Sequence, residues 1–162
     1  EEGIRGNYGA NIGSVLLDME GESVRVRAKA MAAAGSDARM NGCELPVIIN
    51  SGSGNQGITA SVPVIVYAKD MKVSHETLLR ALTLSNLTAI HQKTAIGRLS
   101  AYCGAVSAGA GAGAGIAYLP CHCVRNCLRR SEGFLRGKDC FCGRCRHFGI
   151  SDVYPRPAVL RR

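Results

Sequence analysis

The sequence predicts a mainly α-helical domain whose helices pack closely through small residues. Apolar side chains recur at helical spacing after Ser74, and an uncharged run over residues 99–121 is rich in Ala and Gly. Of the 162 residues 46% are hydrophobic, but only 5% are aromatic and none is Trp, so the core must be built from Ala, Val, Ile and Leu. This length and composition fit one folded domain and exclude collagen-like or strongly charged disordered chains.

The N-terminal part of the chain mixes turn signals with Ala-rich sequence. Residues 3–13 contain four glycines, which predicts a loop with tight turns. Residues 23–34 are rich in Ala and suit a helix, although the alternation of Val and Arg over residues 24–27 equally suits a strand leading into one. We expect Gly35 to end this element and residues 36–39 to form a polar loop.

Three longer helices are predicted, near residues 56–70, 75–93 and 98–119. A Gly/Ser/Asn loop at residues 50–57 precedes the first, and Ser74 is a good N-cap for the second. The third lies in the uncharged run, which is long enough to cross a bilayer. Its five glycines and few large aliphatic side chains would gain little from lipid, so we expect a buried, tightly packed helix and no membrane partner.

Charge and cysteine divide the chain into two parts, residues 1–119 and 120–162. The first part holds ten Lys or Arg and nine Asp or Glu, a balance of +1, whereas the second holds ten and three, a balance of +7. Six of the eight cysteines also lie in the second part. No charged segment followed by an apolar stretch and a cleavage site opens the sequence, so we expect a fragment of a cytoplasmic protein whose cysteines are thiols or metal ligands.

Two segments could carry chemistry. The loop at residues 50–57 could turn backbone N–H groups toward an anion such as a carboxylate at the start of a helix, or it could be a plain connector with an N-cap. His91 and Lys93 lie near the C-terminal end of the helix predicted over residues 75–93. There they could complement the helix dipole or act as a base.

Four sequence motifs resemble the family of L-cysteine desulfidases and iron-sulfur L-serine dehydratase alpha chains. They are SDARM at residues 36–40, NSGSGNQG at 50–57, LTLSNLTAI at 82–90 and GRLSAYCG at 97–104. The order and spacing of these motifs carry the resemblance, and a weaker match precedes them in GNYGANIG. Residues 1–119 would then be a fragment of the family's helical catalytic region, and the family pattern stops after Leu119.

The resemblance implies β-elimination by an enzyme that contains a 4Fe-4S cluster. Three cysteines would hold the cluster, and the products would be pyruvate and ammonia, with sulfide when the substrate is L-cysteine instead of L-serine. By this resemblance Cys103 is a cluster ligand. The small amino-acid substrate would be bound by Ser51, Gly52, Ser53, Gly54, Asn55 and Gln56, with Asp37 and Arg39 as further candidates. Lys93 or His91 would be the base, and a homo-oligomer is an expectation as well.

Two cluster cysteines of the family have no counterpart in this sequence. One belongs to a Gly-Cys-Thr-Glu-Pro motif near the family's N-terminus, and the other to a Cys-Asp-Gly-Ala stretch beyond the position of Cys103. We therefore expect this chain alone to be inactive and to lack the cluster.

The tail over residues 120–162 supports two interpretations. Its wealth of Arg and Cys fits an Ala- and Gly-rich coding sequence read out of frame, which would leave it irregular. Alternatively its thiol and imidazole groups could bind zinc in a basic module with affinity for nucleic acid, although we expect no nucleic-acid partner. The candidate zinc ligands are Cys121, His122, Cys123, Cys127, Cys140, Cys142, Cys145 and His147.

Overall fold

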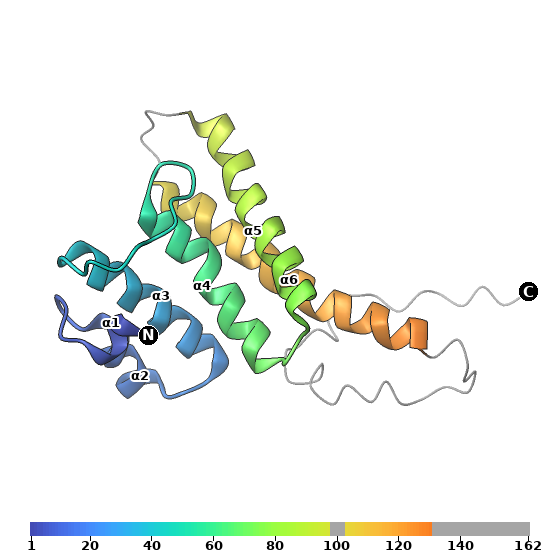
Figure 1. Cartoon of the computed structure of the whole chain (residues 1–162), viewed down its shortest axis with the longest axis horizontal. Coiled ribbons are helices and arrows are strands. Elements are labelled where there is room, and N and C mark those ends of the chain that lie inside the picture. The colour runs from blue at the N-terminus through green and yellow to red at the C-terminus, as the bar shows by residue number, and fades with distance from the viewer. Residues whose placement is uncertain (98–102, 131–162) are drawn as a thin grey trace, which may run out of the picture. The chain divides into compact units, whose positions relative to one another are not determined.

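The computed structural model describes residues 1–97 and 103–130, which form helices and no strand (Figure 1). The helices are α1 (Glu2–Arg5), α2 (Ile12–Glu20), α3 (Val24–Met40), α4 (Gly54–Asp70), α5 (His75–Ile96) and α6 (Gly104–Arg130). The prediction of a mainly α-helical chain is confirmed. Residues 1–122 form one compact unit, which contains every candidate substrate-binding and catalytic residue.

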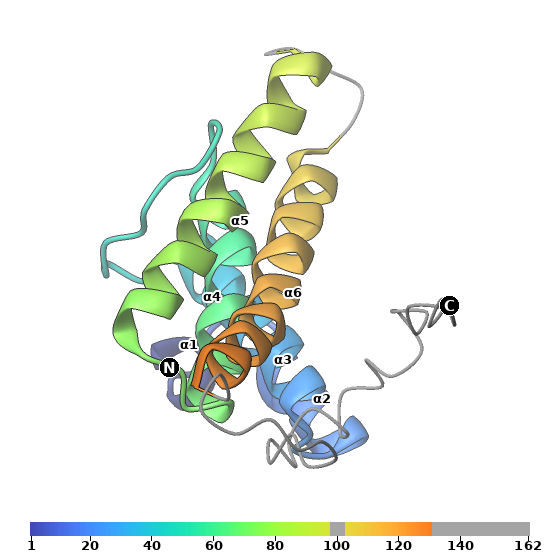
Figure 2. The same cartoon turned by 90° about the vertical axis from the view of Figure 1, so that its right-hand side faces the viewer.

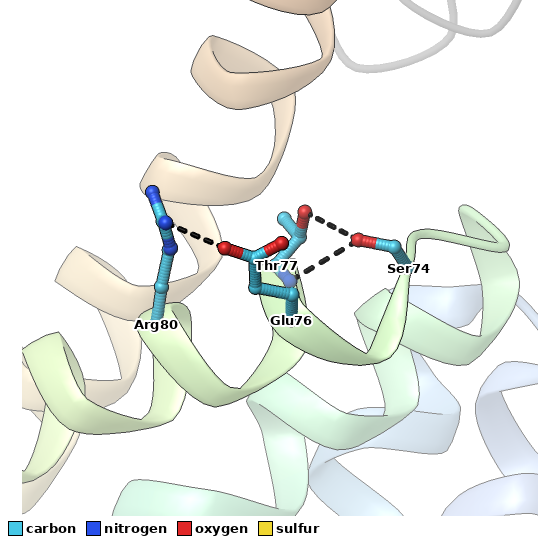
Figure 3. Close-up of polar contacts among 4 residues, drawn as sticks. All are labelled: Ser74, Glu76, Thr77 and Arg80. Carbon is cyan, nitrogen blue, oxygen red and sulfur yellow. Dashed lines mark hydrogen bonds and ion pairs between the residues drawn. The ribbon is translucent and has the colours of Figure 1, made fainter.

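Serine side chains begin three of the helices. The hydroxyl oxygens of Ser23, Ser53 and Ser74 accept hydrogen bonds from backbone N–H groups in the first turns of α3, α4 and α5. Figure 3 shows the start of α5, where the Ser74 hydroxyl lies 3.2 Å from the backbone nitrogen of Thr77. In the same turn Glu76 pairs with Arg80 at 2.5 Å. Such caps satisfy helix N–H groups that have no partner within the helix.

The core lies where α4, α5 and α6 run side by side, as the two views in Figures 1 and 2 agree. Its buried residues are Val64, Ala68, Ala81 and Leu119. Glycines let the backbones approach closely, since a Cβ atom at Gly115 would lie 2.8 Å from the Val64 side chain. The predicted packing through small residues is therefore confirmed.

The loop predicted over residues 3–13 is wrong at both of its ends. Helix α1 covers Glu2–Arg5, and α2 begins at Ile12, so only the middle of this segment is a connection. Gly13 is buried within α2, where a Cβ atom would lie 2.5 Å from that of Ala34. This glycine serves close packing of α2 on α3 instead of a turn.

Helix α3 also extends beyond its predicted end. It runs through Gly35 to Met40, so residues 36–39 are helical, and a strand at residues 24–27 is excluded. Gly35 lies opposite Ile58 of α4, whose nearest side-chain atom is 3.3 Å from the position of an added Cβ. The prediction failed because Gly35 does not end the helix. It instead allows α3 and α4 to approach each other closely.

The helices predicted near residues 56–70 and 75–93 are α4 and α5. Helix α6 begins at Gly104 and continues through Pro120 to Arg130, so helical structure does not end at Leu119. Residues 98–102 and the tail from 131 onward, with Cys140, Cys142, Cys145 and His147, lie outside the described residues. In the described part of the chain no helix is long and apolar enough to span a membrane.

Candidate functional site

A tight turn at residues 50–53, here called the 50–53 turn, leads into α4. Backbone hydrogen bonds of 3.2 Å join Asn50 and Ser53 in both directions. Between them Ser51 and Gly52 have φ angles of 43° and 111°. Both φ angles lie in the left-handed region, which Gly52 adopts without steric cost. The sequence-based expectation of a Gly/Ser/Asn loop before a helix is met.

A cavity of about 590 Å³ brings the turn together with the end of α5. Ser51 and Gly52 of the turn line it together with Lys93 in the last turn of α5. The whole of α4 separates the turn from α5 in the sequence. The remaining lining residues are Ile90, Thr94 and Gly97. Two candidate substrate-binding residues and one candidate base therefore share a single cavity of a size suited to a small molecule.

An amide pair made by the buried Asn50 and the half-buried Asn86 fixes the turn on α5. Asn50 is only 4% exposed, and its Nδ2 donates to Oδ1 of Asn86 at 2.6 Å. The Asn86 amide nitrogen in turn donates to the Leu82 carbonyl at 2.8 Å. Sequence reasoning missed both asparagines, although Asn86 could have been noticed as an amide within the otherwise apolar and hydroxylated motif at residues 82–90. Because the pair anchors the turn, it also sets the place of Ser51 relative to Lys93.

Gln56 connects the same turn to the start of α6. The Ser51 hydroxyl donates to Oε1 of Gln56 at 2.7 Å. The side-chain amide of Gln56 also lies against Gly104, occupying the space that a Cβ atom there would need. Cys103, which is exposed, directly precedes Gly104. The candidate cluster cysteine therefore belongs to a segment that contacts the candidate substrate loop.

Other candidate residues lie apart from this cavity. Arg39 donates to Oδ1 of Asn55 at 3.1 Å and lies against Gly54. It lines a separate cavity of about 810 Å³, mainly between α3 and α4, with an apolar lining and charged residues. Cys43 lines that cavity too, and its hydrogen bond is the main cause that raises the pKa of Tyr8 to about 12. Arg39, Gly54 and Asn55 are thus brought together, but not with Lys93.

Asp37, His91 and Ser53 have other surroundings. Asp37 lies on α3, where its carboxylate accepts from the Ile12 backbone N–H at 3.4 Å and from the Asn41 amide at 3.0 Å. His91 is exposed and does not line the cavity, and its backbone carbonyl accepts from the Thr94 hydroxyl at 2.6 Å. Ser53 is the N-cap of α4.

The described side chains do not fit a 4Fe-4S cluster. Such a cluster requires several thiolates that converge on one place. Among the side chains that the structure describes, no group of three or more Cys, His, Asp or Glu residues could hold a metal ion. Cys103 supplies one thiol beside the candidate substrate loop, and Cys43 lines the other cavity.

The fold and cavity define a helical domain with a small cavity between a turn and a helix end, and comparison with known proteins gives its family. The family model described as serine dehydratase alpha chain matches residues 1–128. The chain therefore belongs to the serine dehydratase alpha chain family, as its motifs indicated. The match continues past Leu119, where we expected the family pattern to stop.

The relatives are longer bacterial proteins that share one uninformative name. The chain is 71% identical over 119 residues to a UPF0597 protein of Lachnoclostridium phytofermentans, a match that covers 74% of the chain and 28% of the relative. A UPF0597 protein of Desulfitobacterium hafniense is 68% identical over 117 residues, covering 72% and 27%. The chain thus spans somewhat over a quarter of the length of these relatives. No solved structure matches it.

Proposed function

We propose that this chain provides the amino-acid-binding site of an enzyme that acts on L-serine or L-cysteine by β-elimination. One observation carries the proposal: in a member of the serine dehydratase alpha chain family, the 50–53 turn and Lys93 line one cavity. Backbone N–H groups of a turn that leads into a helix can bind a carboxylate, and a lysine amine suits proton transfer. Both groups are needed by an enzyme that must hold an amino acid and remove its α-proton.

In this proposal each side of the cavity has one role. N–H groups of Ser51 and Gly52 bind the substrate carboxylate, and the amine of Lys93 acts as the base that takes the proton from Cα. Lys93 is preferred to His91 as the base because His91 does not line the cavity. The electron pair released at Cα forms the double bond of aminoacrylate as the β-hydroxyl or β-thiol leaves. Aminoacrylate then hydrolyses to pyruvate and ammonia.

The departure of the leaving group is not assigned to any described residue. Serine dehydratase alpha chains are generally iron-sulfur dependent, but the described side chains offer no complete ligand set. We therefore expect this chain to bind the amino acid without turning it over. The proposal places the enzyme in the cytoplasm, where a reducing environment keeps Cys103 as a thiol.

A binding experiment with two matched glycine variants tests the site. Calorimetric titration of the chain with L-serine and L-cysteine should detect binding, and Gly52→Ala should weaken it at least about tenfold because φ of 111° is strained for alanine. Gly42→Ala is the control, since Gly42 has φ of 88°, open space around it and no place in this cavity. Equal binding by both variants would refute the cavity as the substrate site.

Turnover is best measured in the longer Lachnoclostridium phytofermentans relative, purified without oxygen. It should release pyruvate from L-serine or L-cysteine. Sulfide released together with pyruvate would identify L-cysteine as a substrate. Alanine at the position corresponding to Lys93 should abolish pyruvate formation, whereas alanine at the position of His91 should not. Activity that survives the lysine substitution would show that another group is the base.

A further inference from the structure

We propose that Gln56 is a positioning residue that makes the Ser51 oxygen a hydrogen-bond acceptor only, so that the cavity selects ligands carrying an ammonium group. This inference deepens the function proposed above and rests on it. The Ser51 hydroxyl has one proton, and that proton is donated to Oε1 of Gln56 at 2.7 Å. Only the lone pairs of the Ser51 oxygen remain for a ligand in the cavity that Ser51 lines.

Gln56 is held in place from two directions. It follows the Ser53 N-cap within the first turn of α4, so the helix sets the direction of its side chain. Its amide also fills the space beside the backbone of Gly104 on α6. An alanine at position 104 would have to displace this amide. The Ser51 proton is therefore oriented by a group that two helices together hold in position.

Among the glycines of α6, Gly104 packs against Gln56, whereas Gly111 and Gly115 pack against α5 and α4 and the others have open space around them. A Cβ atom at Gly109 or Gly113 would have no neighbouring atom within 4 Å. Substitution of Gly113 therefore provides a control on the same helix that adds a methyl group without displacing Gln56.

An acceptor-only oxygen discriminates between ligands of similar shape. L-serine and 3-hydroxypropanoate share a carboxylate and a β-hydroxyl, but only L-serine has an ammonium group to donate to Ser51. A hydrogen bond to a charged group is stronger than one between neutral groups, so we expect a preference for L-serine of roughly 10- to 100-fold. A site without this oriented oxygen would lose that preference while keeping its shape.

Three variants of Gln56 separate hydrogen bonding from packing. Glutamate at position 56 still accepts the Ser51 proton, so Gln56→Glu should retain the preference for L-serine. Methionine has similar volume but accepts poorly, so Gln56→Met should bring the affinity ratio near one, and Gln56→Ala should do the same. The affinities are measured by calorimetry on the whole chain with the two named ligands. Retention of the preference in Gln56→Met would overturn the proposal.

A second measurement needs no ligand. In ¹H–¹⁵N spectra of the labelled chain, Gly104→Ala should shift the backbone amides of Ser51 and Gly52, and Gly113→Ala should not. In the Gln56→Ala background, Gly104→Ala should cause no further shift, because the displaced amide is already absent. Unchanged Ser51 and Gly52 amides in Gly104→Ala would overturn the proposed coupling. Failure of every variant to bind either ligand would instead refute the proposed function and the selectivity with it.

Discussion

Asn50 and Asn86 are two polar side chains whose contributions to stability depend on each other, because they share a hydrogen bond. Asn50 is buried, and its amide nitrogen is satisfied by Asn86, while its Oδ1 has no hydrogen-bond partner among the described residues. Removing one partner from such a pair strands a buried polar group, which costs more than an average hydrogen bond contributes. The stability of the 50–53 turn should therefore depend strongly on Asn86.

We expect Asn86→Leu to lower the free energy of unfolding by about 1–3 kcal/mol. The double variant Asn50→Leu/Asn86→Leu should be less destabilised than the sum of its single variants, since both members of the pair are replaced. Urea denaturation followed by circular dichroism measures all three values. Strict additivity would mean that the two amides do not interact in solution.

The same residues mark how far local sequence could predict the site. The glycine- and serine-rich loop before α4 identified Ser51 and Gly52, and the cation near the end of α5 identified Lys93. Asn50 and Asn86 escaped prediction because they are 36 positions apart and only the folded chain joins them. Asp37 was grouped with the substrate loop by its motif, but it lies in helical structure and bonds to the start of α2.

At the scale of single helices, glycine was the residue most often misread. The sequence pattern predicts a turn around Gly13 and a helix end at Gly35, yet both lie within helices that run on through them. A glycine that ends a helix and one that admits a neighbouring helix have the same sequence signature. The difference depends on what lies opposite, as Ala34 lies opposite Gly13 and Ile58 opposite Gly35. The local sequence pattern therefore predicted the presence of the helices more accurately than the residues at which they begin and end.

Helix α6 allows this distinction to be tested on two glycines in one element. A Cβ atom at Gly111 would clash with the Ser85 carbonyl oxygen and lie 3.1 Å from the Ala89 side chain, whereas one at Gly113 would meet nothing within 4 Å. We expect Gly113→Ala to stabilise the protein by up to about 1 kcal/mol through helix propensity. Gly111→Ala should destabilise it by about 1–3 kcal/mol through overpacking against α5.

Thermal and urea unfolding of the two variants provide the measurement. Each substitution adds the same methyl group two residues apart, so intrinsic helix propensity cancels in the comparison. Equal effects would mean that α6 does not pack on α5 through this face. Opposite signs would confirm that small residues decide the spacing of the two helices.

Within the compact unit of residues 1–122, α5 exposes several leucine side chains that do not belong to the packed core. Leu79 and Leu87 are 50% and 59% exposed, and together with Leu84 they line a shallow cavity of about 420 Å³. Glu76, Arg80 and Thr83 line the same cavity, so this face combines exposed leucines with polar side chains. We propose it as a contact surface between copies of the chain. It gives the expected homo-oligomer a testable location.

We expect the chain to associate reversibly through this face, so that its weight-average mass in sedimentation equilibrium rises with concentration. Leu87→Glu should shift the mass toward that of the monomer, because association would then bury an unpaired carboxylate. Met40→Glu is the matched control, since it also puts a carboxylate in place of an exposed apolar side chain, on α3 and at 66% exposure. If both variants behave alike, added negative charge alone explains the change and α5 is not the contact. If Leu87→Glu alone dissociates the chain, the contact is made by the leucine face of α5, which lies on a different set of residues from those lining the Lys93 cavity.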